Sequence, residues 1–173
     1  MKFTGRSKTL KYLVTFLLVI ATPLAFGADQ PSVQVKPPDV HGPRPIADQT
    51  AEAAVRDYLE SWQAMKSALD QNRASLLNRD FEGEAKDKLT AAISSQMKAG
   101  IHTKYEDRSH NIQIVFYSPE GLSIQLVDNV EYEQQVFQNG KLLATQPARA
   151  RYVVVMTPSQ VRWRVRVFQA QPE

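Results

Sequence analysis

The sequence contains no cysteine, which excludes disulfides, thiolate zinc sites, cysteine-bound iron–sulfur clusters and cysteine nucleophiles. Its seven glycines are scattered and form no phosphate-binding loop. There are three histidines, His41, His102 and His110, which we expect at the surface or in turns. His102 and His110 lie roughly 26 Å apart along an extended strand, too far to share a metal ion. We therefore predict no metal site. We also expect no cofactor and assign no catalytic residue.

Acidic residues are absent from the first 27 positions, which hold Lys2, Arg6, Lys8 and Lys11. The 173-residue chain has a formal charge of +3, but without this leader 17 basic residues stand against 18 acidic ones, a charge of −1. The basic character belongs to the leader. The remainder is not a polycationic nucleic-acid binder, and we predict no nucleic-acid partner.

No apolar run reaches the length of about 20 residues that a spanning helix needs. The longest run, residues 12–26, follows the basic stretch, contains Pro23 and ends at Ala25-Phe26-Gly27. This pattern predicts a secretory signal peptide over residues 1–27, cleaved after Gly27. An uncleaved leader is the alternative and would be the only membrane attachment. Either way the rest of the chain is expected outside the cytoplasm, periplasmic or secreted.

Five prolines in residues 28–47 disfavour helix and central strand, so we expect an extended proline-rich tether there. Residues 48–170 then form one domain, long enough for a single hydrophobic core. Its first part has apolar residues at spacings of three and four, which predicts an amphipathic helix from about Thr50. The residues of this stripe are Val55, Tyr58, Leu59, Trp62, Met65 and Leu69, extended by Leu76 and Leu77.

A second helix is predicted over residues 84–99, where Gly100 suits its end and Ala85, Leu89, Ile93 and Met97 lie on one side. After Gly100 the period changes to two. Strands are expected over residues 111–118, 122–137, 142–156 and 161–168, with a tight hairpin at Asn139-Gly140. The fold class is therefore α+β: two N-terminal helices packed on a curved antiparallel sheet of about four strands, a cystatin-like or cone architecture.

The residues from about Asp48 to Gln169 resemble the nuclear transport factor two-like superfamily, which has this cone fold. The resemblance rests on Tyr58 and Trp62 in the long helix and on the closing hairpin, where Tyr152 and Trp163 stand on adjacent strands. Within the superfamily, residues 58–66 look similar to the inter-envelope domain of division accessory proteins. The tether plus domain also looks similar to periplasmic core subunits of type IV secretion machines. The resemblance implies a pocket or a platform; it transfers no reaction.

Dimerisation through the sheet is common in the superfamily, and the sequence does not decide whether this chain forms a homodimer.

Alternating arginines are the first candidate contact surface. If the last hairpin turns tightly at Pro158-Ser159, Arg164 lies opposite Val153 and Arg166 lies opposite Arg151. The predicted basic face then comprises Arg149, Arg151, Arg162, Arg164 and Arg166. Such a face is either a solvated surface or a docking site for an envelope protein or another acidic surface. For a docking site, changing Arg162, Arg164 and Arg166 to glutamate should abolish partner binding and leave the fold intact.

A pocket carboxylate is the second candidate. Asp128 lies on the otherwise apolar side of its predicted strand, with Tyr132 as the nearest polar companion. Inside a cone with Tyr58 and Trp62, it would suit a small-molecule-binding protein or a lyase or isomerase. Large side chains from both layers favour a filled cone instead. We therefore expect an exported, non-enzymatic binding or assembly domain at the cell envelope, and the pocket protein is the alternative.

Overall fold

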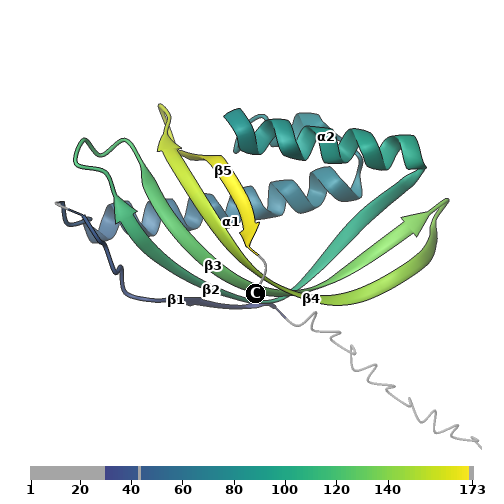
Figure 1. The fold of residues 1–173 in the computed structure, drawn as a ribbon, viewed down its shortest axis with the longest axis horizontal. Coiled ribbons are helices and arrows are strands. Elements are labelled where there is room, and N and C mark those ends of the chain that lie inside the picture. The colour runs from purple at the N-terminus through teal and green to yellow at the C-terminus, as the bar shows by residue number, and fades with distance from the viewer. Residues whose placement is uncertain (1–29, 43, 172–173) are drawn as a thin grey trace, which may run out of the picture.

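The computed structural model describes residues 30–42 and 44–171, so the predicted leader lies outside the described residues (Figure 1). Its two helices are α1 (Asp48–Asp70) and α2 (Gly83–Ala99), joined through the short 3₁₀ helix η1 (Ala74–Leu77). The five strands are β1 (Ser32–Val35), β2 (Ile101–Tyr117), β3 (Ile124–Gln138), β4 (Lys141–Pro158) and β5 (Trp163–Gln171).

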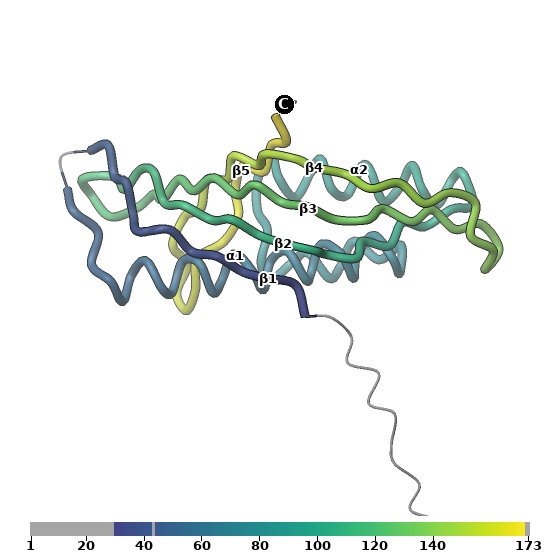
Figure 2. Tube along the Cα trace, turned by 90° about the horizontal axis from the view of Figure 1, so that it is seen from below, coloured from purple at the N-terminus to yellow at the C-terminus, as the bar shows by residue number. Residues whose placement is uncertain are grey.

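One curved sheet carries all five strands in the order β1-β2-β3-β4-β5. The pairs from β2 to β5 are antiparallel, and β1 pairs with β2 in parallel. The sheet bends around α1, and α2 lies over the β5 side (Figure 1). Seen from below, the long strands run side by side beneath the helices, and β1 forms the outer edge (Figure 2). The α+β class and the two-helix layer agree with the sequence prediction.

The sheet has one strand more than the sequence analysis predicts. Part of the proline-rich segment forms β1, and the N–H groups of Asp39 and His41 continue to bond to carbonyls of β2 at 2.9 and 3.1 Å. Prolines are compatible with this position because an edge strand leaves half of its N–H groups unused. Strand β2 also begins at Ile101 rather than at residue 111. Its first half is too polar for the alternation to be visible in the sequence.

Aromatic side chains fill the space between the helices and the sheet. Trp62 of α1 is 1% exposed and makes edge contacts with Tyr152 and His110, at ring distances of 5.3 and 5.1 Å. Phe168 of β5 stacks on Tyr152 at 4.6 Å. Edge-to-face and stacked pairs at these distances are favourable beyond the area they bury. The centre of the cone is thus packed with side chains.

Helix α2 packs less deeply than its sequence pattern predicts. Among its residues only Ala85 and Ile93 are buried, and Met97, expected on the inner side, is 60% exposed. The helix ends as expected at Gly100, whose φ of 67° is the left-handed conformation that glycine adopts without strain. No helix among the described residues is both long enough and apolar enough to cross a membrane.

Candidate functional site

Asp128 is fully buried at the centre of the cone, and both of its carboxylate oxygens are occupied. The hydroxyl of Tyr58 on α1 donates to Oδ2 at 2.8 Å, and Nδ1 of His110 on β2 lies 2.7 Å from the same oxygen. The backbone N–H of Asn111 donates to Oδ1 at 3.0 Å. Burial, followed by the charge of Asp128, raises the pKa of Tyr58 well above 10.0, so the phenol stays a donor.

Asp107 supports the other side of His110. Its side chain is 1% exposed and accepts hydrogen bonds from Trp62 Nε1 at 3.0 Å and from Lys66 Nζ at 2.6 Å. The Nε2 atom of His110 lies 3.9 Å from its Oδ2. Residues three apart on a regular strand face opposite sides, but β2 has a bulge between Asp107 and Ser109. The extra residue turns both side chains inward.

His110 is positively charged at neutral pH in this environment. Burial alone would lower its pKa, but the interactions with Asp107 and Asp128 outweigh burial and raise the pKa from 6.5 to about 9. Burial would raise the pKa of Asp107, yet the nearby His110 imidazolium and the hydrogen bonds from Lys66 and Trp62 hold this pKa at about 2. The cone therefore contains an imidazolium between two carboxylates.

We predict that this charge state makes stability depend on alkaline pH. A raised folded-state pKa stabilises the protein fully below the unfolded pKa of 6.5, and this contribution is lost as the pH rises through about 9. The free energy of unfolding, measured in urea at pH 6 and at pH 9.5, should fall more in wild type than in His110→Gln. The matched control is His102→Gln, because His102 is half-buried and pairs with Asp70 at the end of α1. An equal fall in all three proteins would contradict the assignment.

An apolar groove runs between α1 and the β1 edge of the sheet. Its volume is about 820 Å³, within the range of ligand and peptide sites. Ala51, Val55 and Leu59 line it from the helix, and Val33 and Val35 line it from β1, where they are 44% and 54% exposed. His110 also lines the groove and, since it is almost fully buried, forms part of its floor. Charged residues surround it: Lys36, Asp48, Glu52, Arg56 and Glu60.

The five predicted face arginines do not lie together. The predicted register is wrong: Arg164 lies opposite Thr157, and Arg151 lies opposite Gln171. The chain turns later than expected, in a loop closed by the N–H of Ser159 on the carbonyl of Arg162 at 2.7 Å, and a register shift follows at Val155/Met156. Arg149, Arg151 and Arg166 are exposed.

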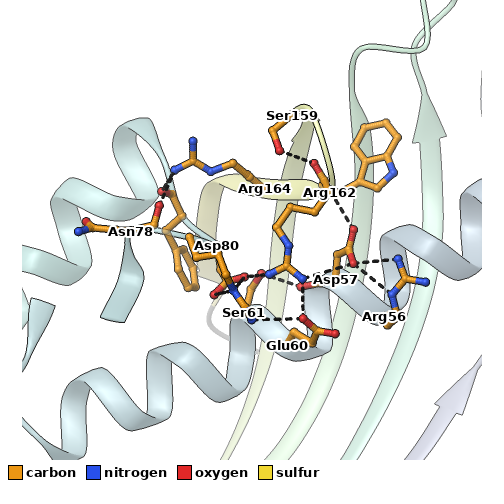
Figure 3. Close-up of polar contacts among 12 residues, drawn as sticks. Arg56, Asp57, Glu60, Ser61, Asn78, Asp80, Ser159, Arg162 and Arg164 are labelled. Carbon is orange, nitrogen blue, oxygen red and sulfur yellow. Dashed lines mark hydrogen bonds and ion pairs between the residues drawn. The ribbon is translucent and has the colours of Figure 1, made fainter. Parts of the chain in front are cut away.

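Arg162 and Arg164 turn toward the helices instead (Figure 3). The Arg162 side chain, 12% exposed, pairs with Glu60 of α1 and with Asp80 after η1, and lies 3.7 Å from Asp57 of α1. Arg164 donates to the carbonyls of Asn78 and Phe81 at 2.9 and 2.6 Å and pairs with Glu82 at 3.0 Å. These two arginines fasten the β4–β5 hairpin to the helical layer.

The four pocket residues of the alternative prediction do come together, since Tyr58 bonds Asp128 and the ring of Trp62 lies 6.2 Å from that of Tyr132. The Tyr132 hydroxyl meets that of Tyr152 at 3.4 Å rather than Asp128. The expectation that His110 lies at the surface is wrong, because it is 2% exposed. Among the described residues there is no group of three or more potential ligands placed to hold a metal ion.

Comparison with solved structures finds the same fold at low sequence identity. The intermembrane space region of the chloroplast protein ARC6 aligns over 75% of this chain and 100% of its own, with a TM-score of 0.62 and 12% identity. A putative scytalone dehydratase from Novosphingobium aromaticivorans aligns over 73% of this chain and 89% of its own, with a TM-score of 0.51 and 13% identity. No family profile and no curated protein sequence matches the chain. At this identity, the structural similarities show only the fold. The chain has the α+β cone fold that its resemblance to nuclear transport factor two-like proteins implies.

Proposed function

We propose that the chain is an exported, non-enzymatic binding or assembly domain that contacts an envelope partner through the groove between α1 and β1. The observation that carries this proposal is the contrast between a filled cone and an open apolar groove. Asp128 is 0% exposed with both oxygens bonded, whereas Val33 and Val35 are about half exposed. Exposed apolar surface gathered in a concave site is typical of a binding surface.

The groove replaces the arginine face as the preferred contact surface in this proposal. Arg162 and Arg164 are engaged within the domain, and their charges are offset by carboxylates. Arg149 is exposed but pairs with Glu131 at 3.0 Å. A basic docking surface that rests on Arg149, Arg151 and Arg166 stays a prediction, and it is tested beside the groove.

The partner is best described as an apolar segment of an envelope protein. The groove offers a helix face with Ala51 and Leu59 and a strand with two valines, so it suits alternating or striped apolar side chains. The ARC6 domain of similar fold lies in an intermembrane space, which is consistent with an envelope role for this chain.

The test compares capture of envelope proteins by three immobilised proteins. The groove variant Ala51→Arg/Leu59→Arg changes two half-buried lining residues, and the surface variant Arg149→Glu/Arg151→Glu changes two exposed arginines. We expect quantitative mass spectrometry to show at least a tenfold loss of wild-type partners for the groove variant and little loss for the surface variant. A loss of about 1.4 kcal/mol of binding free energy already lowers the affinity tenfold. Loss only in the surface variant would favour the basic face. Equal capture by all three would contradict both surfaces.

A pocket enzyme is the second candidate, and one observation favours it: His110, held between two carboxylates, reaches the floor of the groove. A scytalone dehydratase-like neighbour shares the fold. The non-enzymatic proposal is preferred because the hydrogen-bonding atoms of Asp128 are already occupied. A ligand that enters the groove and perturbs the His110 resonances in an NMR titration would favour the pocket protein.

A further inference from the structure

The outer edge of β1 has an ordered set of unused backbone groups. Within the described residues, β1 pairs only with β2, and the N–H of Lys36 donates to the carbonyl of Ile112 at 2.9 Å. Successive residues of a strand direct their N–H and C=O groups to alternate sides. Ser32, Gln34 and Lys36 therefore face β2, while the backbone groups of Val33 and Val35 point away from the sheet.

Prolines bound this free edge on both sides. The outward-facing positions in order are Pro31, Val33, Val35 and Pro37, and proline has no N–H to donate. The edge thus offers N–H donors at the two valines only. The segment Pro-Ser-Val-Gln-Val-Lys-Pro is also symmetric about Gln34 in the positions that matter for pairing, with a valine and then a proline at equal distances on either side.

We propose that β1 pairs antiparallel with β1 of a second copy of this chain, about a two-fold axis at Gln34. Val33 then lies opposite the partner's Val35, and the two residues exchange both backbone hydrogen bonds. Val35 and the second copy's Val33 form the same two hydrogen bonds by symmetry. Every outward valine N–H therefore has a carbonyl acceptor. A register moved by two residues would set a proline opposite a valine, and such a pair can form only one of the two backbone hydrogen bonds that a valine pair forms.

The side chains favour the same arrangement. Val33 and Val35 pair in register with His110 and Ile112, whose side chains face the helices, so both valines belong to the inner face. In the dimer they meet the partner's valines and lose exposed apolar area. Both α1 helices then lie on the same side of a ten-stranded sheet, and the two grooves open toward each other. The second copy therefore contributes wall residues to the site. This inference does not rest on the proposed function.

A cysteine cross-link tests the register directly, because the chain has no cysteine of its own. In the proposed dimer, Gln34 faces the partner's Gln34 in a non-hydrogen-bonded pair, where Cα atoms are about 4.5 Å apart. This separation lies within disulfide range. Gln34→Cys should therefore form a covalent dimer under mild oxidation. In Ser32→Cys the two thiols are offset by four residues, roughly 13 Å, and should cross-link at least tenfold more slowly.

Sedimentation of residues 28–173, which lack the predicted leader, gives a second, independent measurement. Wild type is expected to be dimeric, and Val35→Pro, which removes one outward N–H, should be monomeric. Val35→Ala keeps that N–H and should remain dimeric. Equal cross-linking rates for the two cysteine variants would overturn the proposal, and so would a wild-type protein that stays monomeric up to its solubility limit. Loss of envelope partners in the groove variant leaves this result unaffected, so the two proposals fail separately.

Discussion

Replacing Arg162 with methionine is expected to lower the free energy of unfolding by about 3–5 kcal/mol, the usual cost of removing one member of a buried ion pair. Asp57 and Asp80 are each 2% exposed, and the arginine that lies between them comes from a different part of the chain (Figure 3). Without it, two carboxylates that are shielded from water face each other with less positive charge between them. Methionine retains most of the side-chain volume, so the loss reports mainly on charge.

Urea denaturation with wild type, Arg162→Met and a surface control measures this effect. Arg149→Met is the matched control, because Arg149 pairs with Glu131 at 3.0 Å but is 72% exposed. Exposed pairs contribute about 0–1 kcal/mol, so this variant should remain close to wild type. Similar losses in both variants would show that the Arg162 cluster does not carry the stability assigned to it.

The same contacts correct an expectation drawn from the sequence. Alternation in the sequence predicts that changing Arg162, Arg164 and Arg166 to glutamate leaves the fold intact. Glutamate at position 162 would instead add a fourth negative charge to Asp57, Glu60 and Asp80. A loss of partner binding in that triple variant would report on unfolding. This is the reason for using Arg149 and Arg151 to test the basic surface.

Removing the central carboxylate is the second change with a large expected effect. Asp128→Ala should destabilise the protein by about 3–5 kcal/mol, because the His110 imidazolium then loses a buried counter-ion. Tyr58 and the Asn111 N–H lose their acceptor as well, and unsatisfied buried donors are costly. Asp128→Asn keeps the shape and should be less destabilising.

The pKa of His110 gives a readout that a loss of packing alone would not change. In Asp128→Asn, NMR titration should show this pKa below its wild-type value of about 9, because one of the two carboxylates that raise it is neutral. The alkaline loss of stability should then begin at lower pH. Asp39→Asn is the control, since Asp39 pairs with His41 at 3.5 Å and both are well exposed. An unchanged His110 pKa would contradict the buried cluster as described.

Periodicity allowed the helices and the inner face of β3 to be predicted, because these segments are regular. Tyr58, Trp62 and Asp128 all lie inside the cone, where the spacing of their neighbours places them. His110 could not be found in this way. Strict alternation from Thr103 places residue 110 on the outer face, and only the bulge after Asp107 reverses it. A polar strand carries no hydrophobic pattern from which such an insertion is visible.

The predicted pairing of the β5 arginines with residues of β4 was wrong for a related reason. Alternation in residues 161–168 fixes which residues share a face of β5, but it does not fix which residue of β4 each one meets. That depends on the length of the turn, and Ser159 and Arg162 close a longer one than the tight turn assumed at Pro158-Ser159. Arg162 also pairs with Asp57, Glu60 and Asp80, which lie far from it in the sequence. The spacing of residues within one strand cannot predict such tertiary contacts.

The bulge in β2 makes the number of residues in this strand as important as their identity. Thr103, Tyr105 and Asp107 face inward before it, and His110, Ile112 and Ile114 face inward after it. Arg108, the additional residue between them, is itself mostly in solvent. Its side chain makes no contribution to the core. Its backbone, however, determines which residues of the following half of β2 face inward. In a chain one residue shorter at this point, the side chains on one side of the deletion would change faces. Either Tyr105 and Asp107 or His110 and Ile112 would then point into water.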